Sequence, residues 1–148
     1  MIDRAIIGRE WPPFEVEIEK GRLTLLAKAI GETRPIYTDE AAARAAGYRS
    51  IVAPPTFAFC LQADSPVGSG YLTDVGIPIT DVLHGEQSYT FHDVTCAGDR
   101  VRVTRRVVDV YDKKGGALEF VAFESEVRHA DSGALVAVGR QVMIWRHR

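Results

Sequence analysis

The stretch Ile51-Val-Ala-Pro-Pro-Thr-Phe-Ala-Phe-Cys-Leu61 is the longest apolar run in the sequence. A membrane-spanning helix needs about 20 apolar residues, so this run is too short to cross a bilayer and fits a protein core instead. Proline suits the first turn of a helix, because its φ is already helical and the N–H that it lacks would have no partner there. We therefore predict a helix that begins near Pro55 and Thr56, stays apolar until Gln62 and is buried on all sides.

Two further helices are predicted on the N-terminal side of this run. The first spans Glu19–Ile30, where apolar residues recur at the i, i+3, i+4 and i+7 spacing of one buried face, and Gly31 suits its C-terminal cap. The second spans Asp39–Ala46, with Thr38 as the expected N-cap and Gly47 at its end. Nothing else in residues 1–70 is predicted to be more than loop.

The second half of the chain has the apolar pattern and the turn signals of β-strands. Short Gly- and Asp-containing turns separate the segments, which predicts antiparallel hairpins rather than crossovers. The predicted strands are Val82–His92, Asp99–Tyr111, Leu118–Arg128 and Ala134–His147. Helices followed by strands in one small domain predict an α+β fold with an antiparallel sheet.

Two details of the predicted strands go beyond a simple sheet. Val101 and Val103 fall on one face and Val108 and Val110 on the other, which indicates a β-bulge between them. The later strands contain segments that are apolar on both faces, so both faces need a cover. We expect the buried helix on one face and a second subunit on the other.

Composition limits the class of protein. The chain has 148 residues, 46% of them hydrophobic and 26% charged, which predicts a single globular domain over residues 1–148. A net charge of −2 gives no support for binding nucleic acid or an anionic membrane. The two cysteines, Cys60 and Cys96, cannot form a disulfide framework and have no Cys-x-x-Cys spacing for zinc. We expect both to be structural and the protein to be soluble and cytoplasmic.

An apolar helix wrapped by a long antiparallel sheet describes the hot-dog fold. Residues 30–37, Ile-Gly-Glu-Thr-Arg-Pro-Ile-Tyr, precede an Ala-rich segment that ends at Gly47. This arrangement resembles the MaoC-like hydratase/dehydratase family, whose signature Gly-Asp-x-Asn-Pro-Ile-His precedes a short Ala-rich helix. Other segments look like the N-terminal, non-catalytic type of dehydratase domain in that family: Ile51-Val-Ala-Pro-Pro-Thr-Phe57, Val82-Leu-His-Gly-Glu-Gln87 and Ala97-Gly-Asp99.

The resemblance implies a reaction class. The family hydrates trans-2-enoyl thioesters, or dehydrates (R)-3-hydroxyacyl thioesters, on coenzyme A or acyl carrier protein, and it uses no metal or redox cofactor. An acid and a base move a proton between water and the α-carbon, a backbone N–H stabilises the thioester oxygen, and a tunnel holds the acyl chain.

The catalytic positions of the family are altered in this chain. The family's aspartate falls on Glu32, its asparagine on Arg34 and its histidine on Tyr37. An unperturbed tyrosine has a pKa of about 10 and is about 0.1% ionised at pH 7, whereas histidine titrates near 6.5. Loss of acid–base help costs roughly 10²–10⁴-fold in rate. Glu32 and Arg34 also fit a solvated ion pair, and Tyr37 a packed aromatic side chain.

The expected oxyanion site is altered as well. The family's His-Gly pair before the central helix falls on Pro54 and Pro55, which have no backbone N–H, and the Thr56 N–H remains a candidate donor. Phe57 and Phe59 on the predicted helix either close an acyl tunnel or fill the core. The substrate-binding candidates are Arg34, Pro55, Thr56, Phe57 and Phe59.

A second candidate acid–base pair lies on a predicted strand. His84 and Glu86 are two residues apart, so a regular strand would point both to the same face as a base with an orienting carboxylate. The alternative is a hydrogen-bonded histidine at a subunit interface. Gly85 between them suggests a close approach of another chain segment.

Four arginines form the strongest basic cluster: Arg100, Arg102, Arg105 and Arg106. They are either a solvated strand face or a dock for a phosphopantetheine phosphate or an acidic carrier protein.

We therefore expect an acyl-tunnel-forming subunit of an (R)-specific enoyl-thioester hydratase or 3-hydroxyacyl-thioester dehydratase, which acts in fatty acid metabolism as a homodimer or beside a catalytic MaoC-type subunit. The alternatives are a self-sufficient homodimeric enoyl-CoA hydratase that uses Glu32 and Tyr37, or His84 and Glu86, and a non-enzymatic acyl-thioester-binding protein or thioesterase.

Overall fold

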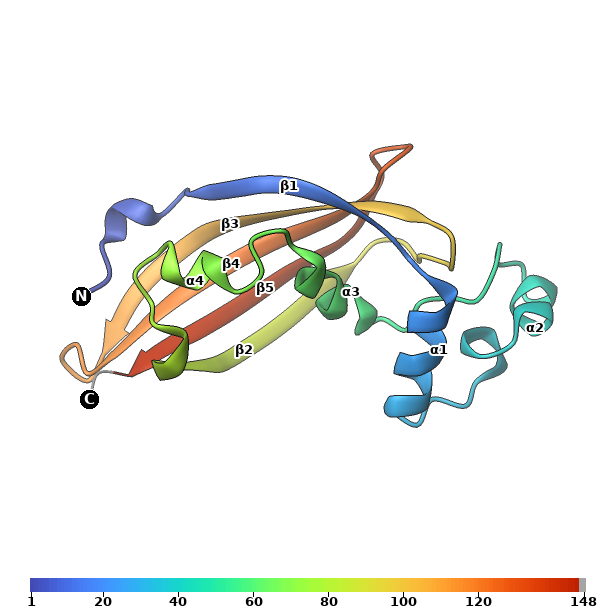
Figure 1. The fold of residues 1–148 in the computed structure, drawn as a ribbon, viewed down its shortest axis with the longest axis horizontal. Coiled ribbons are helices and arrows are strands. Elements are labelled where there is room, and N and C mark those ends of the chain that lie inside the picture. The colour runs from blue at the N-terminus through green and yellow to red at the C-terminus, as the bar shows by residue number, and fades with distance from the viewer. Residues whose placement is uncertain (147–148) are drawn as a thin grey trace.

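A five-stranded antiparallel sheet forms the body of the protein in the computed structural model, which describes residues 1–146 (Figure 1). The strands lie in the order β1-β3-β4-β5-β2. Their bounds are β1 Glu10–Glu17, β2 Val82–Phe91, β3 Arg100–Lys113, β4 Leu118–His129 and β5 Leu135–Arg146. The α+β class expected from the sequence is confirmed, although His147, the last residue of the predicted final strand, lies outside the described residues.

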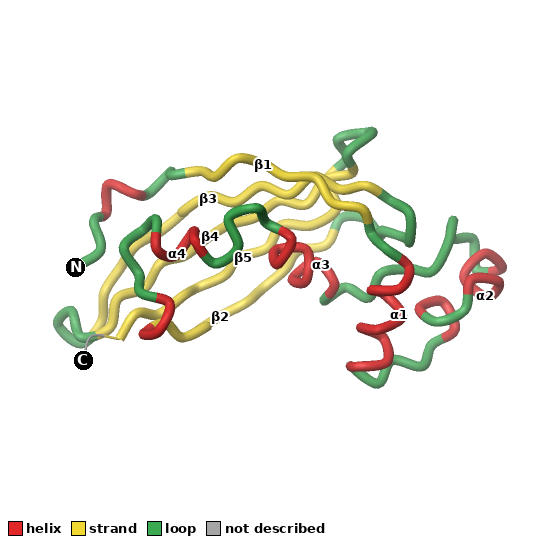
Figure 2. The backbone as a smooth tube through the Cα atoms, in the orientation of Figure 1, coloured by secondary structure: helices red, strands yellow, loops and turns green. Residues whose placement is uncertain are grey.

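Short helices lie at one end of the sheet and across one of its faces (Figures 1 and 2). The α-helices are α1 Lys20–Ala29, α2 Glu40–Ala45, α3 Phe57–Cys60 and α4 Gly70–Thr73. Single 3₁₀ turns are present at Arg4–Ile6, Pro35–Tyr37, Leu61–Asp64 and Ile79–Asp81. None of the helices in the described part of the chain has the length and apolarity needed to span a membrane.

The prediction of one long, fully buried helix after Pro55 is wrong. α3 is a single turn that continues into the 3₁₀ turn Leu61–Asp64, a loop follows, and α4 begins at Gly70. Phe59 is 44% exposed and Cys60 is half-buried, because only one side of so short a helix can face the sheet. The α3–α4 segment nevertheless covers the sheet in the place expected for the central helix.

The two predicted N-terminal helices are confirmed, with one change of cap. Asp39, not Thr38, is the N-cap of α2, because its Oδ1 accepts a hydrogen bond from the Ala42 N–H at 2.8 Å. Gly31 and Gly47 have φ of +69° and +93° just past the ends of α1 and α2, the left-handed conformation that glycine adopts most readily.

Strand β1 was not predicted and lies at one edge of the sheet, paired with β3. Pro12 and Pro13 interrupt its pattern, and the register shifts between Trp11 and Phe14. An edge strand tolerates proline because one of its sides has no ladder partner.

The predicted hairpin between β2 and β3 is wrong. β2 forms the opposite edge and pairs with β5, from Val82 opposite Trp145 to Phe91 opposite Ala137. The loop after Phe91 therefore crosses the end of the sheet before β3 begins. The hairpins β3–β4 and β4–β5 are confirmed.

The predicted bulge is present in β3, where the register with β4 shifts between Val107 and Asp109. The sequence predicted Val110 on the same face as Val108. Because of the extra residue in the bulge, Val110 instead packs in the same buried cluster as Val107. Val108 alone packs on the opposite face.

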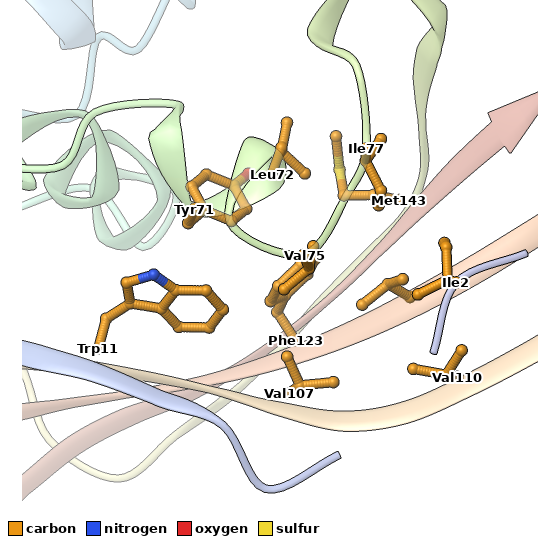
Figure 3. Close-up of a cluster of buried hydrophobic side chains, with 11 residues drawn as sticks. Ile2, Trp11, Tyr71, Leu72, Val75, Ile77, Val107, Val110, Phe123 and Met143 are labelled. Carbon is orange, nitrogen blue, oxygen red and sulfur yellow. The ribbon is translucent and has the colours of Figure 1, made fainter. Parts of the chain in front are cut away.

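The inner face of the sheet carries two hydrophobic clusters. In the first, the rings of Phe123 and Tyr71 pack edge-on with their centres 5.1 Å apart, and the Trp11 ring centre lies 6.0 Å from that of Phe123 (Figure 3). Because Tyr71 belongs to α4, these contacts hold α4 over the sheet. The second cluster joins α1 and α3 to the other end of the sheet through Leu23 and Phe57. Burial of these apolar surfaces is the main source of stability for the fold.

Part of the opposite face of the sheet carries a further apolar cluster, as expected from the two-faced strands. Phe120, Ala122 and Val142 are buried there, with Tyr111 stacked on Phe120 at 4.7 Å. No helix of residues 1–146 contributes to this cluster.

Candidate functional site

Glu32 is positioned by the C-terminus of α1. The Gly31 N–H donates to the Lys28 carbonyl at 3.3 Å and the Glu32 N–H donates to the Ala27 carbonyl at 2.8 Å. These two bonds around a left-handed glycine are the Schellman pattern that ends many helices. The motif therefore holds the backbone of Glu32 firmly against the end of α1.

The Glu32 carboxylate is bound by Arg34. The guanidinium donates from Nη2 to Oε2 at 2.6 Å and from Nε to Oε1 at 3.0 Å, and the Arg34 backbone N–H donates to Oε1 at 2.9 Å. These bonds lower the pKa of Glu32 from 4.5 to about 2. A carboxylate with so low a pKa is a weak base, so this arrangement is poorly suited to proton abstraction.

Tyr37 ends the 3₁₀ turn that follows Arg34. Its side chain is buried, and the Arg34 guanidinium lies 4.8 Å from the centre of its ring, a cation–π geometry. The three altered motif positions therefore form one unit in space: Arg34 contacts both the Glu32 carboxylate and the Tyr37 ring.

Tyr37 lines a cavity of about 170 Å³ at the end of the sheet. Pro54 and Pro55 before α3 and Phe57 at its start line it too, together with Phe91 at the end of β2. The structure therefore brings together three predicted site residues, Tyr37, Pro55 and Phe57. Glu32, Arg34, Thr56 and Phe59 are not among its lining residues.

The start of α3 offers few backbone donors to this cavity. The Phe57 N–H donates to the Pro54 carbonyl at 2.8 Å and the Ala58 N–H to the Pro55 carbonyl at 3.3 Å. Neither proline has an N–H. Thr56 is exposed, and within residues 1–146 its N–H donates no hydrogen bond to a backbone carbonyl.

His84 and Glu86 are separated by a bulge, contrary to the predicted same-face arrangement. The register between β2 and β5 shifts between them. His84 lies near Gln141 on the inner face and stacks on Phe59 at 5.7 Å, whereas Glu86 faces Arg140 at 3.5 Å. The extra residue, Gly85, does meet a close neighbour as predicted, since a Cβ there would lie 2.6 Å from Ile144 Cδ1.

The predicted arginine cluster is divided between the two faces of the sheet. Arg100 and Arg106 are exposed and pair with Glu15 and Glu124. Arg105 instead points inward, since it occupies the inner-facing row that continues from Val101 and Val103 to Val107, and it is buried. The prediction that the four arginines form one basic surface is therefore wrong.

The sequence interpretation missed a polar belt on the inner face, between the two hydrophobic clusters. Three neighbouring strands place Arg105, Ser125 and Gln141 at buried positions there. Gln62 from the segment after α3 joins them, because its Nε2 donates to Ser125 Oγ at 3.1 Å and its Oε1 accepts from Arg105 Nη2 at 2.7 Å. The signal was present as polar residues at inward positions of otherwise apolar strands.

Sequence comparisons identify relatives along nearly the whole chain. A UPF0336 protein of Saccharopolyspora erythraea is 31% identical over 146 residues, which cover 98% of this chain and 92% of that protein. A UPF0336 protein of Clavibacter michiganensis is 37% identical over 142 residues, which cover 94% of this chain and 92% of that protein.

Solved structures share the fold. The HadBC (3R-hydroxyacyl-ACP dehydratase) complex from Mycobacterium tuberculosis has a chain that matches with a TM-score of 0.80 at 24% identity, covering 94% of this chain and 96% of that chain. The ChsH1-ChsH2 complex from the same organism matches with a TM-score of 0.73 at 25% identity, covering 93% of this chain and 84% of that chain. A MaoC-like dehydratase matches with a TM-score of 0.83 at 19% identity, covering 96% of this chain and 42% of that chain. The protein has the hot-dog fold.

The model of the FAS1-like dehydratase domain region matches residues 5–138, which contain the four α-helices and strands β1 to β4. The chain therefore belongs to the FAS1-like dehydratase domain family.

Proposed function

We propose that this chain is the tunnel-forming, non-catalytic subunit of an (R)-specific enoyl-thioester hydratase or 3-hydroxyacyl-thioester dehydratase that acts on fatty acyl thioesters in the cytoplasm. A partner hot-dog subunit supplies the Asp/His pair. The cavity beside Tyr37 contributes to the wall of the acyl site.

The observation that carries the proposal is the closed Glu32–Arg34 pair. The carboxylate at the family's catalytic position accepts four hydrogen bonds from Arg34, which lower its pKa to about 2. A general base works best with a pKa near the working pH, so this carboxylate is suited to holding the loop rather than to proton transfer. The buried Tyr37 in the histidine position fits the same role.

The edge strand β2 supports a partner. One side of β2 pairs with β5, and the other side has no strand beside it among residues 1–146. Leu83 is 56% exposed on this strand, and Phe91 at its end is also exposed. A second hot-dog subunit that adds its own edge strand would extend the sheet and cover both side chains. The HadBC and ChsH1-ChsH2 structures are complexes of two named components, which fits this arrangement.

The test is a hydration assay with a short trans-2-enoyl-CoA. We expect no turnover above background by the purified chain alone. We expect turnover when a MaoC-type subunit with the intact Asp/His motif is added, and the Tyr37→Phe variant should support it equally well. Robust turnover by the chain alone would contradict the proposal and favour a self-sufficient hydratase.

Two exposed leucines provide a matched test of the partner surface. Leu83→Lys places a charge at the β2 edge, whereas Leu25→Lys places the same charge on α1, where the leucine is 68% exposed. We expect Leu83→Lys to abolish co-elution with the catalytic subunit and Leu25→Lys to leave it unchanged. Equal behaviour of the two variants would refute pairing through β2.

A further inference from the structure

A second cavity, of about 570 Å³, lies over the polar belt. It falls within the roughly 300–1,000 Å³ of many small-molecule sites. Its walls combine apolar and polar groups, and they include Phe59, Cys60, Gln62, Tyr71, Arg105 and Gln141. It shares no lining residue with the cavity beside Tyr37, so the two are separate sites on the α3–α4 segment.

The burial and the contacts of Arg105 indicate that this cavity binds a ligand. The residue is only 7% exposed and occupies a row of inward-facing valines on β3. Its guanidinium lies 3.9 Å from the centre of the Tyr71 ring and donates to Gln62 Oε1 at 2.7 Å. No ion pair formed within residues 1–146 includes Arg105.

A buried guanidinium without a carboxylate partner is costly. It carries five N–H donors, and one neutral acceptor with one aromatic ring replaces only part of its hydration. Burial lowers the pKa of Arg105, in keeping with this loss of solvation. The other arginine at the cavity, Arg22, is neutralised by Asp64 at 2.8 Å. The wall therefore presents one uncompensated positive charge beside apolar surface.

We propose that this cavity binds a carboxylate carried on an apolar chain, with the Arg105 guanidinium as its counterion. The carboxylate accepts charge-assisted hydrogen bonds from Arg105, and the chain lies against Phe59 and Cys60. The ligand is either a free fatty acid or an acyl thioester whose far end bears a free carboxylate. The site stands on its own geometry and does not require the proposed function.

The test is calorimetric titration of the purified full chain with octanoate and with octan-1-ol, which has the same chain length and no charge. Charge-assisted hydrogen bonds correspond to roughly a tenfold to hundredfold difference in affinity, so we expect octanoate to bind at least about tenfold more tightly. Octanedioyl-CoA against octanoyl-CoA then separates the sources. Tighter binding of octanedioyl-CoA than of octanoyl-CoA assigns the carboxylate to the far end of an acyl thioester. Equal affinity for the two thioesters, together with binding of octanoate, assigns the carboxylate to a free fatty acid.

Matched variants place the effect at the cavity. Arg105→Met should remove the preference for octanoate, and Arg102→Met, on the exposed face of the same strand, should retain it. Equal affinity for octanoate and octan-1-ol in the wild-type chain would overturn the proposal even if Arg105→Met does not fold. Absence of acid binding, with loss of self-association in Arg105→Met by light scattering, would also overturn it and assign Arg105 to a subunit contact.

Discussion

Replacement of Leu23 by alanine tests how far the anchoring of α1 depends on the core. Leu23 is fully buried, in the cluster that joins α1 and α3 to the sheet, whereas Leu25 on the same helix is 68% exposed. Leu→Ala removes three carbons, worth about 0.8 kcal/mol each on transfer, or about 2.4 kcal/mol. The cavity left behind adds to this, so we expect Leu23→Ala to lower the free energy of unfolding by about 3–4 kcal/mol. Both substitutions have the same effect on helix propensity, so the difference between them isolates burial.

The measurement is urea unfolding at fixed protein concentration, followed by circular dichroism and by tryptophan fluorescence. Leu25→Ala should stay within about 0.5 kcal/mol of the wild type. For a chain of this size, a loss of 3 kcal/mol also lowers Tm by roughly 6–12 °C. A loss below about 1 kcal/mol for Leu23→Ala, or equal losses for both variants, would refute the assigned role of Leu23 in the core.

Further predictions concern the Glu32 pair and two glycines. Arg34→Ala should raise the pKa of Glu32 from about 2 toward 4.5, measured by a ¹³C carboxyl titration; an unchanged pKa would contradict the assigned cause. Because the folded-state pKa is lowered, the pair stabilises the fold above about pH 4.5 and loses this effect as the pH falls toward 2, so the variant should lack that pH dependence of unfolding. Gly139→Ala should lower the free energy of unfolding by about 1–3 kcal/mol, because its Cβ would lie 2.5 Å from Tyr89 Cε1. Gly21→Ala, in α1 with no atom within 4 Å of the added Cβ, should instead raise it by up to about 1 kcal/mol in the same urea assay; destabilisation by both alanines would contradict the contact argument.

Local sequence signals predicted the parts of the fold that depend on local chemistry. Glycines at positive φ mark the ends of α1 and α2, and short turns mark the hairpins of β3, β4 and β5. Strand β1 was missed because Pro12 and Pro13 resemble a loop, and only its place at a sheet edge makes them acceptable. The partner of β2 was wrong because connection length permits a hairpin but does not exclude a distant strand with a matching register.

The site was harder to predict because it depends on which face each side chain takes. One bulge at Gly85 moves His84 and Glu86 to opposite faces, and no local pattern announces it. The prediction for the family's motif positions was closer to the structure, because Arg34 does pair with Glu32 and also contacts the Tyr37 ring. Arg105 was misplaced because its charge suggested solvent exposure, although the period-two row of valines around it pointed inward.

The strand order also has a consequence for how the chain folds. β3, β4 and β5 follow one another in sequence and form hairpins, so their contacts close small loops. Both edge strands pair with strands that are distant in the sequence, since Glu10 pairs with Arg106 and Val82 with Trp145. The entropy lost in closing such long loops slows the formation of these pairings. We expect the central meander to form first and the edges to dock later. During synthesis, β1 must then wait unpaired until β3 emerges, and β2 must wait until β5 emerges, so both edge strands stay exposed while the chain is incomplete.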